Sequence, residues 1–319
     1  MNPPDFWRTG GWPAAALAPL GWLYAAGGAA RLRWGASFDP GVPTICVGNL
    51  TLGGAGKTPT VLALAARLRA RGRRVAILSR GHGGSALGPV RVDPAQHDAA
   101  DVGDEPLLLA RDNAVWVAKD RAAAARAALA DGADFLLMDD GFQSPALRKT
   151  LSLVVVDGGA GIGNGRVFPA GPLREPAARG LARANAGVLI GAEENRFVAA
   201  VAGGKAPLRA RLAPRAGDLA GARVFAFAGI GRPGKFFASL RDIGCEIVDT
   251  RAFPDHHPYA RAEIEALIAA AGPARLATTE KDLVRIPADL RARIAALPVD
   301  LVFEDPDALD ALLAAAVPA

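Results

Sequence analysis

The sequence predicts an α/β fold in which a parallel β-sheet is flanked by helices. Unbroken apolar segments of strand length, such as 135–138 and 153–156, alternate with segments of helical periodicity. Strands of a parallel sheet are buried on both faces, so they read as continuous apolar runs. A second series of strand and helix patterns begins near residue 224 and predicts a smaller α/β domain. The uncharged stretch 9–30 predicts a separate helical segment ahead of both domains.

The composition is that of a globular chain. Its 319 residues are 51% hydrophobic and 22% charged, which excludes a disordered protein and leaves room for two cores. The formal charge of +5 permits contact with anionic lipid, nucleic acid or a phosphorylated substrate. Aromatic residues do not interleave with a basic stripe, so no nucleic-acid partner is predicted. Cys46 and Cys245 lie far apart in apolar surroundings, which is typical of buried thiols in a reducing compartment.

The N-terminal segment, residues 1–34, is predicted to associate with a membrane. Residues 9–30 carry no charge and are flanked by arginines. Pro13, Pro19 and the many alanines and glycines argue against a spanning helix. Trp12 and Trp22 suit the headgroup level of a bilayer. We expect a short helix or helical hairpin in the membrane interface; the alternative is a helix packed on the protein's own core.

Residues 51–58 are typical of a phosphate-binding loop. They follow the apolar strand pattern 44–47 and open a helix. Glycines let backbone N–H groups close around phosphate oxygens, Lys57 neutralises them, and the hydroxyl of Thr58 reaches a bound Mg²⁺. One departure is Thr51, which stands where this pattern usually begins with glycine. The predicted nucleotide-binding residues of the loop are Thr51, Leu52, Gly53, Gly54, Ala55, Gly56, Lys57 and Thr58.

The elements that follow predict a P-loop NTPase-type domain over residues 35–220. A helix from Pro59 ends at Gly72 and leads to the next strand, which gives a βαβ unit. A glycine-rich loop over 158–171 and a less patterned stretch around 195–220 interrupt the series. The predicted strands are 44–47, 74–78, 115–117, 135–138, 153–157 and 186–190, with a helix over 121–130.

Residues 221–319 are predicted to form the smaller domain. Strands near 224–228, 246–248 and 276–278 alternate with helices near 235–243 and 259–271. A strand at 301–303 and a C-terminal helix are expected to close this second domain.

Four polar clusters are candidates for chemistry. Asp139 and Asp140 end an apolar strand about 80 residues after the phosphate loop, where P-loop proteins place the acid that holds Mg²⁺. The alternative is a pair of turn aspartates at the end of the strand. Asp104 and Glu105 precede Pro106, which suits a helix cap or a kinase base.

The other two clusters lie later in the chain. His256 and His257 are adjacent, and one of them could tune the Asp104 carboxylate or simply cap a loop. Arg174 and Glu175 end the glycine-rich loop. The arginine fits a phosphate and the glutamate a metal shell, although a structural salt bridge is the competing interpretation.

Taken together, these segments resemble the tetraacyldisaccharide 4'-kinase family, the lipid A 4'-kinases of Gram-negative bacteria. The matching segments run almost from end to end and are more specific together than any one motif. They are VGNLTLGGAGKTP, LSRGHGG, VGDEP, MDDGFQ, VVVDGG, GNGRVFPAGPLREP, FAGIGRPGKFF, FPDHHPY and TTEKDLVRI.

The resemblance implies ATP-dependent phosphorylation of the 4'-hydroxyl of a tetraacyldisaccharide 1-phosphate, a lipid A precursor. It implies ATP as co-substrate, Mg²⁺ as cofactor, and a peripheral location at the cytoplasmic face of the inner membrane. The partners implied are the lipid substrate and the membrane surface; no obligate protein partner is evident.

The resemblance also implies roles for particular residues. Asp104 is the base that acts on the 4'-hydroxyl, and His256 or, alternatively, His257 is its partner. Lys57 holds phosphate during the transfer. Arg121 and Arg174 are phosphate contacts. The implied metal residues are Thr58, Glu105, Asp139, Asp140 and Glu175.

One position departs from the family pattern, because His82 stands where the motif SRGYGG usually has tyrosine. Two other functional classes are the alternatives: a membrane-associated switch ATPase, and a soluble small-molecule kinase or GTPase. A membrane-associated switch ATPase of the MinD/ParA type should carry a signature lysine where this chain has Leu52. A GTPase should carry an NKxD-like element, and TTEKD at 278–282 has the wrong order.

Overall fold

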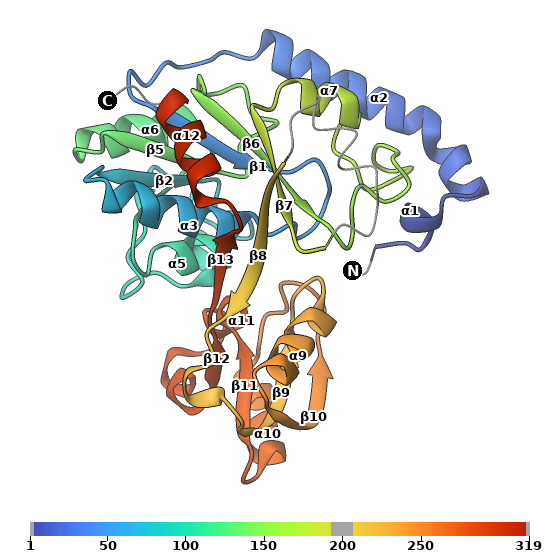
Figure 1. The fold of residues 1–319 in the computed structure, drawn as a ribbon, viewed down its shortest axis with the longest axis vertical. Coiled ribbons are helices and arrows are strands. Elements are labelled where there is room, and N and C mark those ends of the chain that lie inside the picture. The colour runs from blue at the N-terminus through green and yellow to red at the C-terminus, as the bar shows by residue number, and fades with distance from the viewer. Residues whose placement is uncertain (1–2, 193–206, 317–319) are drawn as a thin grey trace.

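The computed structural model describes residues 3–192 and 207–316 of the chain. These residues form a large upper domain, built on a nine-stranded sheet, and a small lower domain, built on a four-stranded sheet (Figure 1). The sheet orders are β13-β8-β7-β6-β1-β5-β2-β4-β3 and β10-β9-β11-β12. This is the predicted α/β architecture with a mostly parallel sheet.

The strands of the large sheet are β1 (Thr44–Gly48), β2 (Val75–Ser79), β3 (Val90–Arg91), β4 (Ala114–Val117), β5 (Phe135–Asp139), β6 (Leu151–Asp157), β7 (Ala186–Ile190), β8 (Leu208–Pro214) and β13 (Val299–Phe303). The small sheet consists of β9 (Arg223–Ala228), β10 (Glu246–Ala252), β11 (Arg275–Thr279) and β12 (Ala295–Leu297).

The α-helices are α1 (Phe6–Thr9), α2 (Trp12–Trp34), α3 (Lys57–Ala70), α4 (Ala99–Val102), α5 (Asp104–Leu109), α6 (Arg121–Ala130), α7 (Ala177–Ala182), α9 (Pro233–Asp242), α10 (Arg261–Ala271), α11 (Glu280–Leu283) and α12 (Pro306–Ala316). Two 3₁₀ segments, Gly217–Leu219 and Ala288–Arg293, complete the described elements.

The centre of the large sheet positions the phosphate loop. Strand β1 is parallel to β5 on one side and β6 on the other, and all five of its residues are buried. In open parallel sheets, ligands bind at the carboxyl ends of such central strands. The loop therefore emerges at the usual binding edge.

Helix α3 covers one face of this sheet and shows why the local sequence folds as it does. Val61, Leu64 and Leu68 recur at helical spacing, are buried, and join the core cluster on that face. Burying each such side chain is worth about 1.5–3 kcal/mol. The helix begins at Lys57, two residues before the predicted start at Pro59, because Gly56 adopts φ 87° and caps it.

The prediction that residues 301–303 and the last helix close the small domain was wrong. Strand β13 pairs antiparallel with β8 at the edge of the large sheet. Leu309 and Leu313 of α12 lie in the same core cluster as α3, and Asp310 pairs with Arg67. The physical reason is that the large domain offers both partners. The open edge of β8 pairs with β13, and the apolar face beside α3 buries α12.

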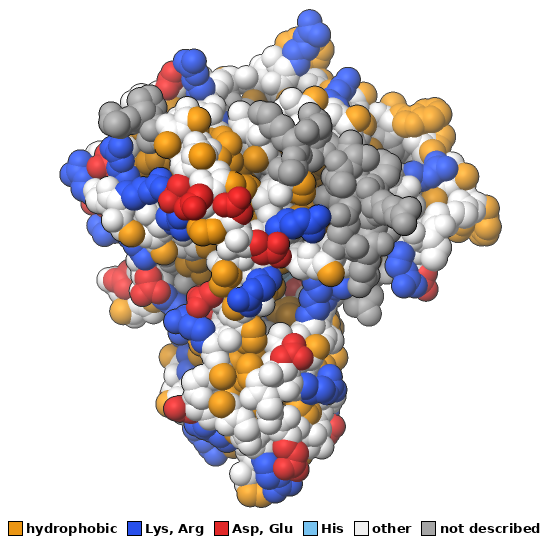
Figure 2. Space-filling view, viewed as in Figure 1, with side chains coloured by type: hydrophobic (Ala, Val, Ile, Leu, Met, Phe, Trp, Pro, Cys, Tyr) orange, Lys and Arg blue, Asp and Glu red, His pale blue; other side chains and the backbone are white. Residues whose placement is uncertain are grey.

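The chain thus leaves the large domain through β8, builds the small domain, and returns through β13. These two strands lie side by side where the domains meet (Figure 1). Figure 2 shows acidic and basic side chains interspersed over this junction.

The N-terminal segment forms one long helix rather than a hairpin, although Pro19 lies within it. Helix α2 docks through Gly21, where a Cβ would lie 2.9 Å from the carbonyl oxygen of Val167. None of the described helices has the length and hydropathy needed to cross a membrane. The large hydrophobic side chains exposed along the helix are Trp12, Leu20, Trp22, Leu23, Tyr24 and Trp34.

Candidate active site

A polar cavity of about 240 Å³ opens beside the carboxyl ends of β2 and β5. It draws side chains from helix α2, from the loop after β2, from α5 and α6, and from the turn after β5. The lining residues are Arg31, Ser79, Arg80, His82, Glu105, Arg121, Asp139, Asp140, Gln143, Ser144 and Arg174. Five of them were predicted from the sequence as site residues, namely Glu105, Arg121, Asp139, Asp140 and Arg174.

The phosphate loop is held in shape by Asn49, a buried residue that the sequence interpretation missed. Its amide donates to the Thr51 hydroxyl (3.3 Å) and to the Gly53 carbonyl (3.3 Å). The Lys57 ammonium donates back to the Asn49 side-chain oxygen at 3.3 Å. The only sequence signal for Asn49 is its place between strand and loop. Its role is to close the loop before a ligand arrives.

The glycines of the loop serve two purposes. A Cβ at Gly56 would lie 2.4 Å from Cδ1 of Ile190, so only glycine fits this packed turn. Gly53 and Gly54 are exposed, and nothing lies within 4 Å of a Cβ built there. Their backbone N–H groups are therefore open to an incoming phosphate.

The Asp139 carboxylate is shielded from water, and one of its oxygens has no hydrogen-bond donor to replace it. The side chain is buried, and its Oδ1 has no hydrogen-bond partner. Burial, followed by the nearby Glu105 carboxylate, raises the pKa of Asp139 to about 7. A buried carboxylate with an unpaired oxygen is a natural ligand for a cation, which would restore its ionised form.

The Asp140 carboxylate faces Arg174 and Lys57 and is ionised. Its Oδ1 accepts from Arg174 at 2.8 Å, and its Oδ2 lies 3.8 Å from the Lys57 ammonium. Burial opposes its charge, but Lys57 and Arg174 outweigh that effect and hold the pKa of Asp140 below its usual value. The residue adopts φ 50°, a left-handed conformation that is uncommon outside glycine. This turn lets the two neighbouring carboxylates face different partners.

Arg121 and Arg174 brace this turn. Arg121 donates to the carbonyl oxygens of Asp139 (3.3 Å) and Asp140 (2.7 Å), while its buried Nε has no partner. Arg174 also donates to the carbonyl of Thr51 at 3.1 Å, which links the turn to the phosphate loop. Both guanidinium groups line the cavity, as their predicted role as phosphate contacts requires.

Asp104 meets His256 across the two domains. Asp104 is buried at the start of α5, and its Oδ2 lies 2.9 Å from Nδ1 of His256. Gly103, the residue before Asp104, packs closely on the loop after β2, because a Cβ there would lie 2.5 Å from the His82 carbonyl oxygen. His256 adopts φ 58° and is tied by its N–H to the carbonyl of Gly229.

The Asp104 carboxylate is held in its charged form. Burial alone would favour the protonated acid. The hydrogen bond from His256 and the positive charges of Lys281 and Arg285 outweigh burial and lower the pKa of Asp104. The Nε of Arg285 lies 3.5 Å from its Oδ2. An ionised carboxylate here can accept a proton at neutral pH.

His257 is placed elsewhere. Its Nε2 lies 2.7 Å from Oε2 of Glu263, and its ring stacks on Phe253 with 4.8 Å between centroids. The geometry therefore pairs Asp104 with His256 and gives His257 a structural position. His82, which departs from the family pattern, lines the cavity and approaches the His256 ring edge-on at 6.3 Å.

The two glutamates predicted for the metal shell have other partners. Glu105 lines the cavity, and its Oε1 accepts from the Lys281 ammonium at 3.0 Å. Glu175 does not line the cavity. Both of its oxygens lie 2.6 Å from Nη2 of Arg183, and Gln143 donates to it at 3.1 Å. The salt-bridge alternative for Glu175 is what the geometry shows.

Across the two described stretches of chain, no group of three or more His, Cys, Asp and Glu side chains is arranged to hold a metal ion. This is compatible with Mg²⁺, which usually takes one or two carboxylates and completes its shell with water and substrate phosphates. Asp139 and Asp140 line the cavity, and Thr58 lies in the first turn of α3.

Several site residues carried no recognised signal in the sequence. Arg31 reaches the cavity from α2 and donates to the carbonyl of Gln143 at 2.7 Å. Lys281 and Arg285 come from the TTEKDLVRI segment, to which no role had been given. Their positions depend on how the small domain docks, which no local pattern encodes.

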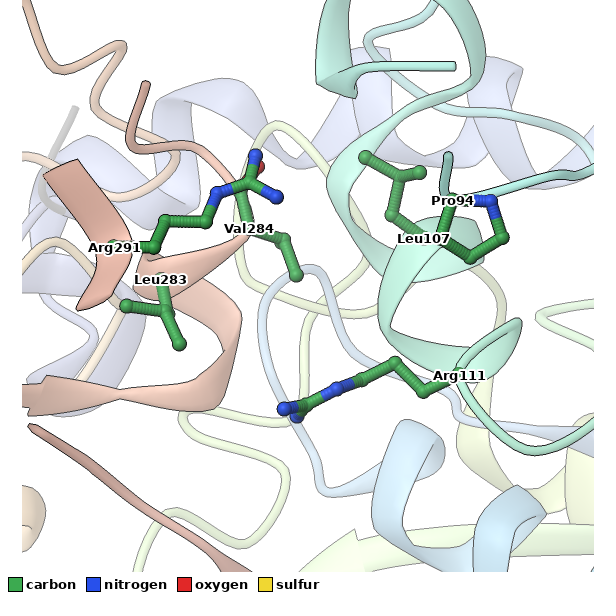
Figure 3. A pocket seen from close by; sticks show the side chains of 6 residues that line it. All are labelled: Pro94, Leu107, Arg111, Leu283, Val284 and Arg291. Atoms are coloured by element: carbon green, nitrogen blue, oxygen red, sulfur yellow. The ribbon is translucent and has the colours of Figure 1, made fainter. Parts of the chain in front are cut away.

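A second cavity, of about 160 Å³, lies behind α5, between that helix and the α11 region (Figure 3). Leu107 and Arg111 project from the large domain, and Leu283, Val284 and Arg291 from the small one. It contains none of the predicted site residues. It marks the contact through which α11 reaches the start of α5.

Comparisons with known proteins show which family the chain is similar to. A sequence model described as Tetraacyldisaccharide-1-P 4'-kinase matches residues 13–318. A tetraacyldisaccharide 4'-kinase of Rhodospirillum centenum is 54% identical over 325 residues, covering 98% of this chain and 96% of the relative. One from Methylorubrum extorquens is 54% identical over 327 residues, covering 100% and 99%.

A solved structure is also similar. It is the crystal structure of the "apo" form of LpxK from Aquifex aeolicus in complex with ATP. The TM-score is 0.77 at 26% sequence identity, and the match covers 96% of this chain and 99% of that one.

Proposed function

The chain belongs to the tetraacyldisaccharide-1-P 4'-kinase family, and we propose that its phosphoryl transfer takes place between Lys57 and Asp104. The protein is an ATP-dependent kinase that phosphorylates the 4'-hydroxyl of a tetraacyldisaccharide 1-phosphate in lipid A biosynthesis. The switch-ATPase alternative is set aside, because the matches are to kinases across nearly the whole chain.

The nucleotide side of the reaction uses the phosphate loop. The Lys57 ammonium now rests on Asn49 and near Asp140. When ATP binds, it exchanges these contacts for phosphate oxygens. The N-terminus of α3 and the free N–H groups of Gly53 and Gly54 add to the positive field. Arg121 and Arg174 stand beside the same space and supply guanidinium donors.

The acceptor side uses Asp104. Its ionised carboxylate accepts a hydrogen bond from the 4'-hydroxyl, aligns that oxygen with the γ-phosphorus, and takes its proton as the new P–O bond forms. The bond between the γ-phosphorus and the bridging oxygen breaks in the same step, and ADP leaves with that oxygen. In kinases such a residue mainly orients the hydroxyl and accepts the proton late, so a lowered pKa is acceptable. His256 donates to the other side of the carboxylate and fixes its direction.

The magnesium proposal rests on residues that fit the ion. The unpaired Oδ1 of Asp139 and the carboxylate of Asp140 lie next to the phosphate loop. Together with the Thr58 hydroxyl they would hold Mg²⁺. Glu105 is the remaining candidate from the cavity wall, and Glu175 is not retained. When bound, the ion neutralises charge on the transferring phosphoryl group.

The membrane proposal rests on α2. Trp12 is 82% exposed and Trp22 is 73% exposed. Hydrophobic side chains gather along this helix in Figure 2. An acylated substrate stays in its bilayer, so a kinase that lies against the cytoplasmic face of the inner membrane can reach its sugar. Arg31, near the end of the same helix, connects this surface with the cavity.

Flotation with anionic lipid vesicles tests the membrane proposal. We expect the double variant Trp12→Ser/Trp22→Ser to lose about 10-fold in vesicle partitioning, because each tryptophan contributes apolar area to the interface. Leu87→Ser is the matched control, since Leu87 is 74% exposed but lies in the loop between β2 and β3. Equal partitioning of all three proteins would reject the proposal.

The observation that carries the base assignment is the buried contact between Asp104 and His256. We expect Asp104→Asn to lower kcat by about 10²–10⁴-fold, the usual contribution of a general base, with the Kd for ATP unchanged. Thin-layer separation of labelled lipid product measures the first, and equilibrium binding the second. A near-normal kcat would end the assignment.

A further inference from the structure

Lys281 lies in the TTEKDLVRI segment and contacts both sides of the domain junction. It comes from α11 of the small domain, and its ammonium is 3.0 Å from Oε1 of Glu105 and 3.4 Å from Nε2 of His256. Among the described residues it therefore joins a carboxylate of the large domain to the histidine that contacts Asp104. Neither contact serves the core of the small domain.

The contact with His256 constrains where the imidazole carries its proton. An ammonium group has three donors and no acceptor, so Nε2 must be the unprotonated nitrogen when it faces Lys281. Burial works against the positive charge, but Glu105 and Asp104 outweigh it and raise the pKa of Lys281. The remaining hydrogen then sits on Nδ1, which is the nitrogen that faces Asp104.

The competing tautomer also has a candidate partner. Oδ1 of Asp255 lies 3.9 Å from Nε2 of His256, beyond hydrogen-bond distance. Without the ammonium, Asp255 would be the nearest charged group to Nε2 and would attract a proton there. The imidazole would then present a bare Nδ1 to Asp104 and could no longer donate to it. His82 approaches the ring edge-on, and Arg285 lies 3.5 Å from the Oδ2 of Asp104.

We propose that Lys281 is a positioning residue that holds His256 in the Nδ1–H tautomer and thereby orients the Asp104 carboxylate toward the acceptor hydroxyl. This rests on the proposed role of Asp104. It gives the small domain a defined part in the reaction, because its docking delivers both the histidine and the cation that sets its tautomer.

The test combines kinetics with ¹⁵N imidazole spectra of Lys281→Met. We expect kcat to fall about 10- to 100-fold, the usual effect of losing a partner that fixes a histidine tautomer, while KM for ATP stays within about 2-fold. The chain has four histidines, so His256 is assigned by single His82, His97 and His257 variants. Its Nε2 should be unprotonated in the unmodified chain and become protonated in Lys281→Met.

Two further variants separate positioning from stability. Arg111→Met removes the 2.6 Å ion pair between Arg111 and Glu280, which crosses the same junction one residue before Lys281. It should keep kcat and the tautomer. Lys281→Arg keeps a cationic donor and should recover part of kcat. Thermal melting and ATP binding check that every variant is folded.

An unchanged tautomer in Lys281→Met overturns the proposal, and so does an equal loss of kcat in Arg111→Met. A changed tautomer with unchanged kcat also overturns it. When kcat is unchanged in Lys281→Met, the rate of Asp104→Asn shows which proposal fails. A near-normal rate in Asp104→Asn means that the assignment of the base is wrong, and a low rate means that the role of Lys281 is wrong.

Discussion

The two ends of the reaction space are built in different ways. The nucleotide end is one continuous segment: β1, the loop over 49–58 and the start of α3, closed by internal hydrogen bonds of Asn49. The base end exists only where two domains meet, because Asp104 comes from α5 and His256 from the small domain. The nucleotide end is therefore preformed, whereas the base end depends on docking.

The same difference appears in the backbone. In the stretches that the structure describes, Asp140 and His256 are the non-glycine residues with positive φ, one at each end. Such conformations cost of order 1–3 kcal/mol and persist where the surroundings enforce them. Lys57, Arg174 and Arg121 enforce the first within one domain. A contact to Lys281 within the small domain and a contact to Asp104 across the junction hold the second.

Lys57→Met should lower activity the most, because it disrupts the phosphate-binding loop at the nucleotide end. Losing the buried cation removes the charge that faces the phosphates and leaves Asp140 with Arg174 as its remaining ion pair. We expect kcat/KM for ATP to fall by about 10³-fold, the order lost with a preorganised group that stabilises transition-state charge. Steady-state kinetics measure it. A loss confined to the lipid substrate's KM would contradict the division into two ends.

His256→Ala should have an intermediate effect and would break the base end alone. We expect kcat to fall about 10- to 100-fold, because Asp104 loses the donor that orients it, while ATP affinity is retained. His257→Ala is the matched control. It removes the Glu263 contact and the ring stack on Phe253, so it should lower Tm but spare kcat. Similar kcat losses in both variants would count against the pairing with Asp104.

Asp139→Asn, measured by thermal stability without metal rather than by activity, should give the smallest change and sharpens the comparison. The folded-state pKa of Asp139 is raised from 3.8 to about 7, so the native state binds the extra proton across that window. Its contribution to stability is therefore full below pH 3.8 and is lost as pH rises toward 7. In EDTA at pH 8, Asp139→Asn should melt about 2–4 °C higher, the shift produced by about 1 kcal/mol.

The control for this measurement is Asp242→Asn, a change at an exposed carboxylate at the end of α9. Its Tm should follow the unmodified chain at every pH. If Asp139→Asn melts lower than the unmodified chain at pH 8, the carboxylate is not the unsatisfied group that its surroundings suggest.

The sequence predicted those parts of the molecule that depend on neighbours along the chain. The phosphate loop, β5 with its two aspartates, and the βαβ unit through α3 were recognisable because burial and turn chemistry act locally. Asp104 and His256 were paired only through family resemblance, since 152 residues separate them. Lys281 received no role, because Glu105 lies on the other domain and His256 lies 25 residues away along the chain.

The position of the last strand shows the same limit. Residues 299–303 alternate in burial as an edge strand does, and nothing in that pattern says which sheet they join. The partner was β8, whose own pattern was too weak to be predicted. Pairing between two weak strands is decided by the whole sheet rather than by either segment.

The path of the chain through β8 and β13 has a consequence for synthesis on the ribosome. Residues 217–297, which hold the small sheet, are continuous, so they are complete once the ribosome has passed them. The large domain cannot complete its fold until β13 and α12 have been synthesised, because β13 is its edge strand and Leu309 and Leu313 fill its core. The part made second can therefore mature first, and a nascent chain stalled before residue 299 would expose an open sheet edge to chaperones and proteases.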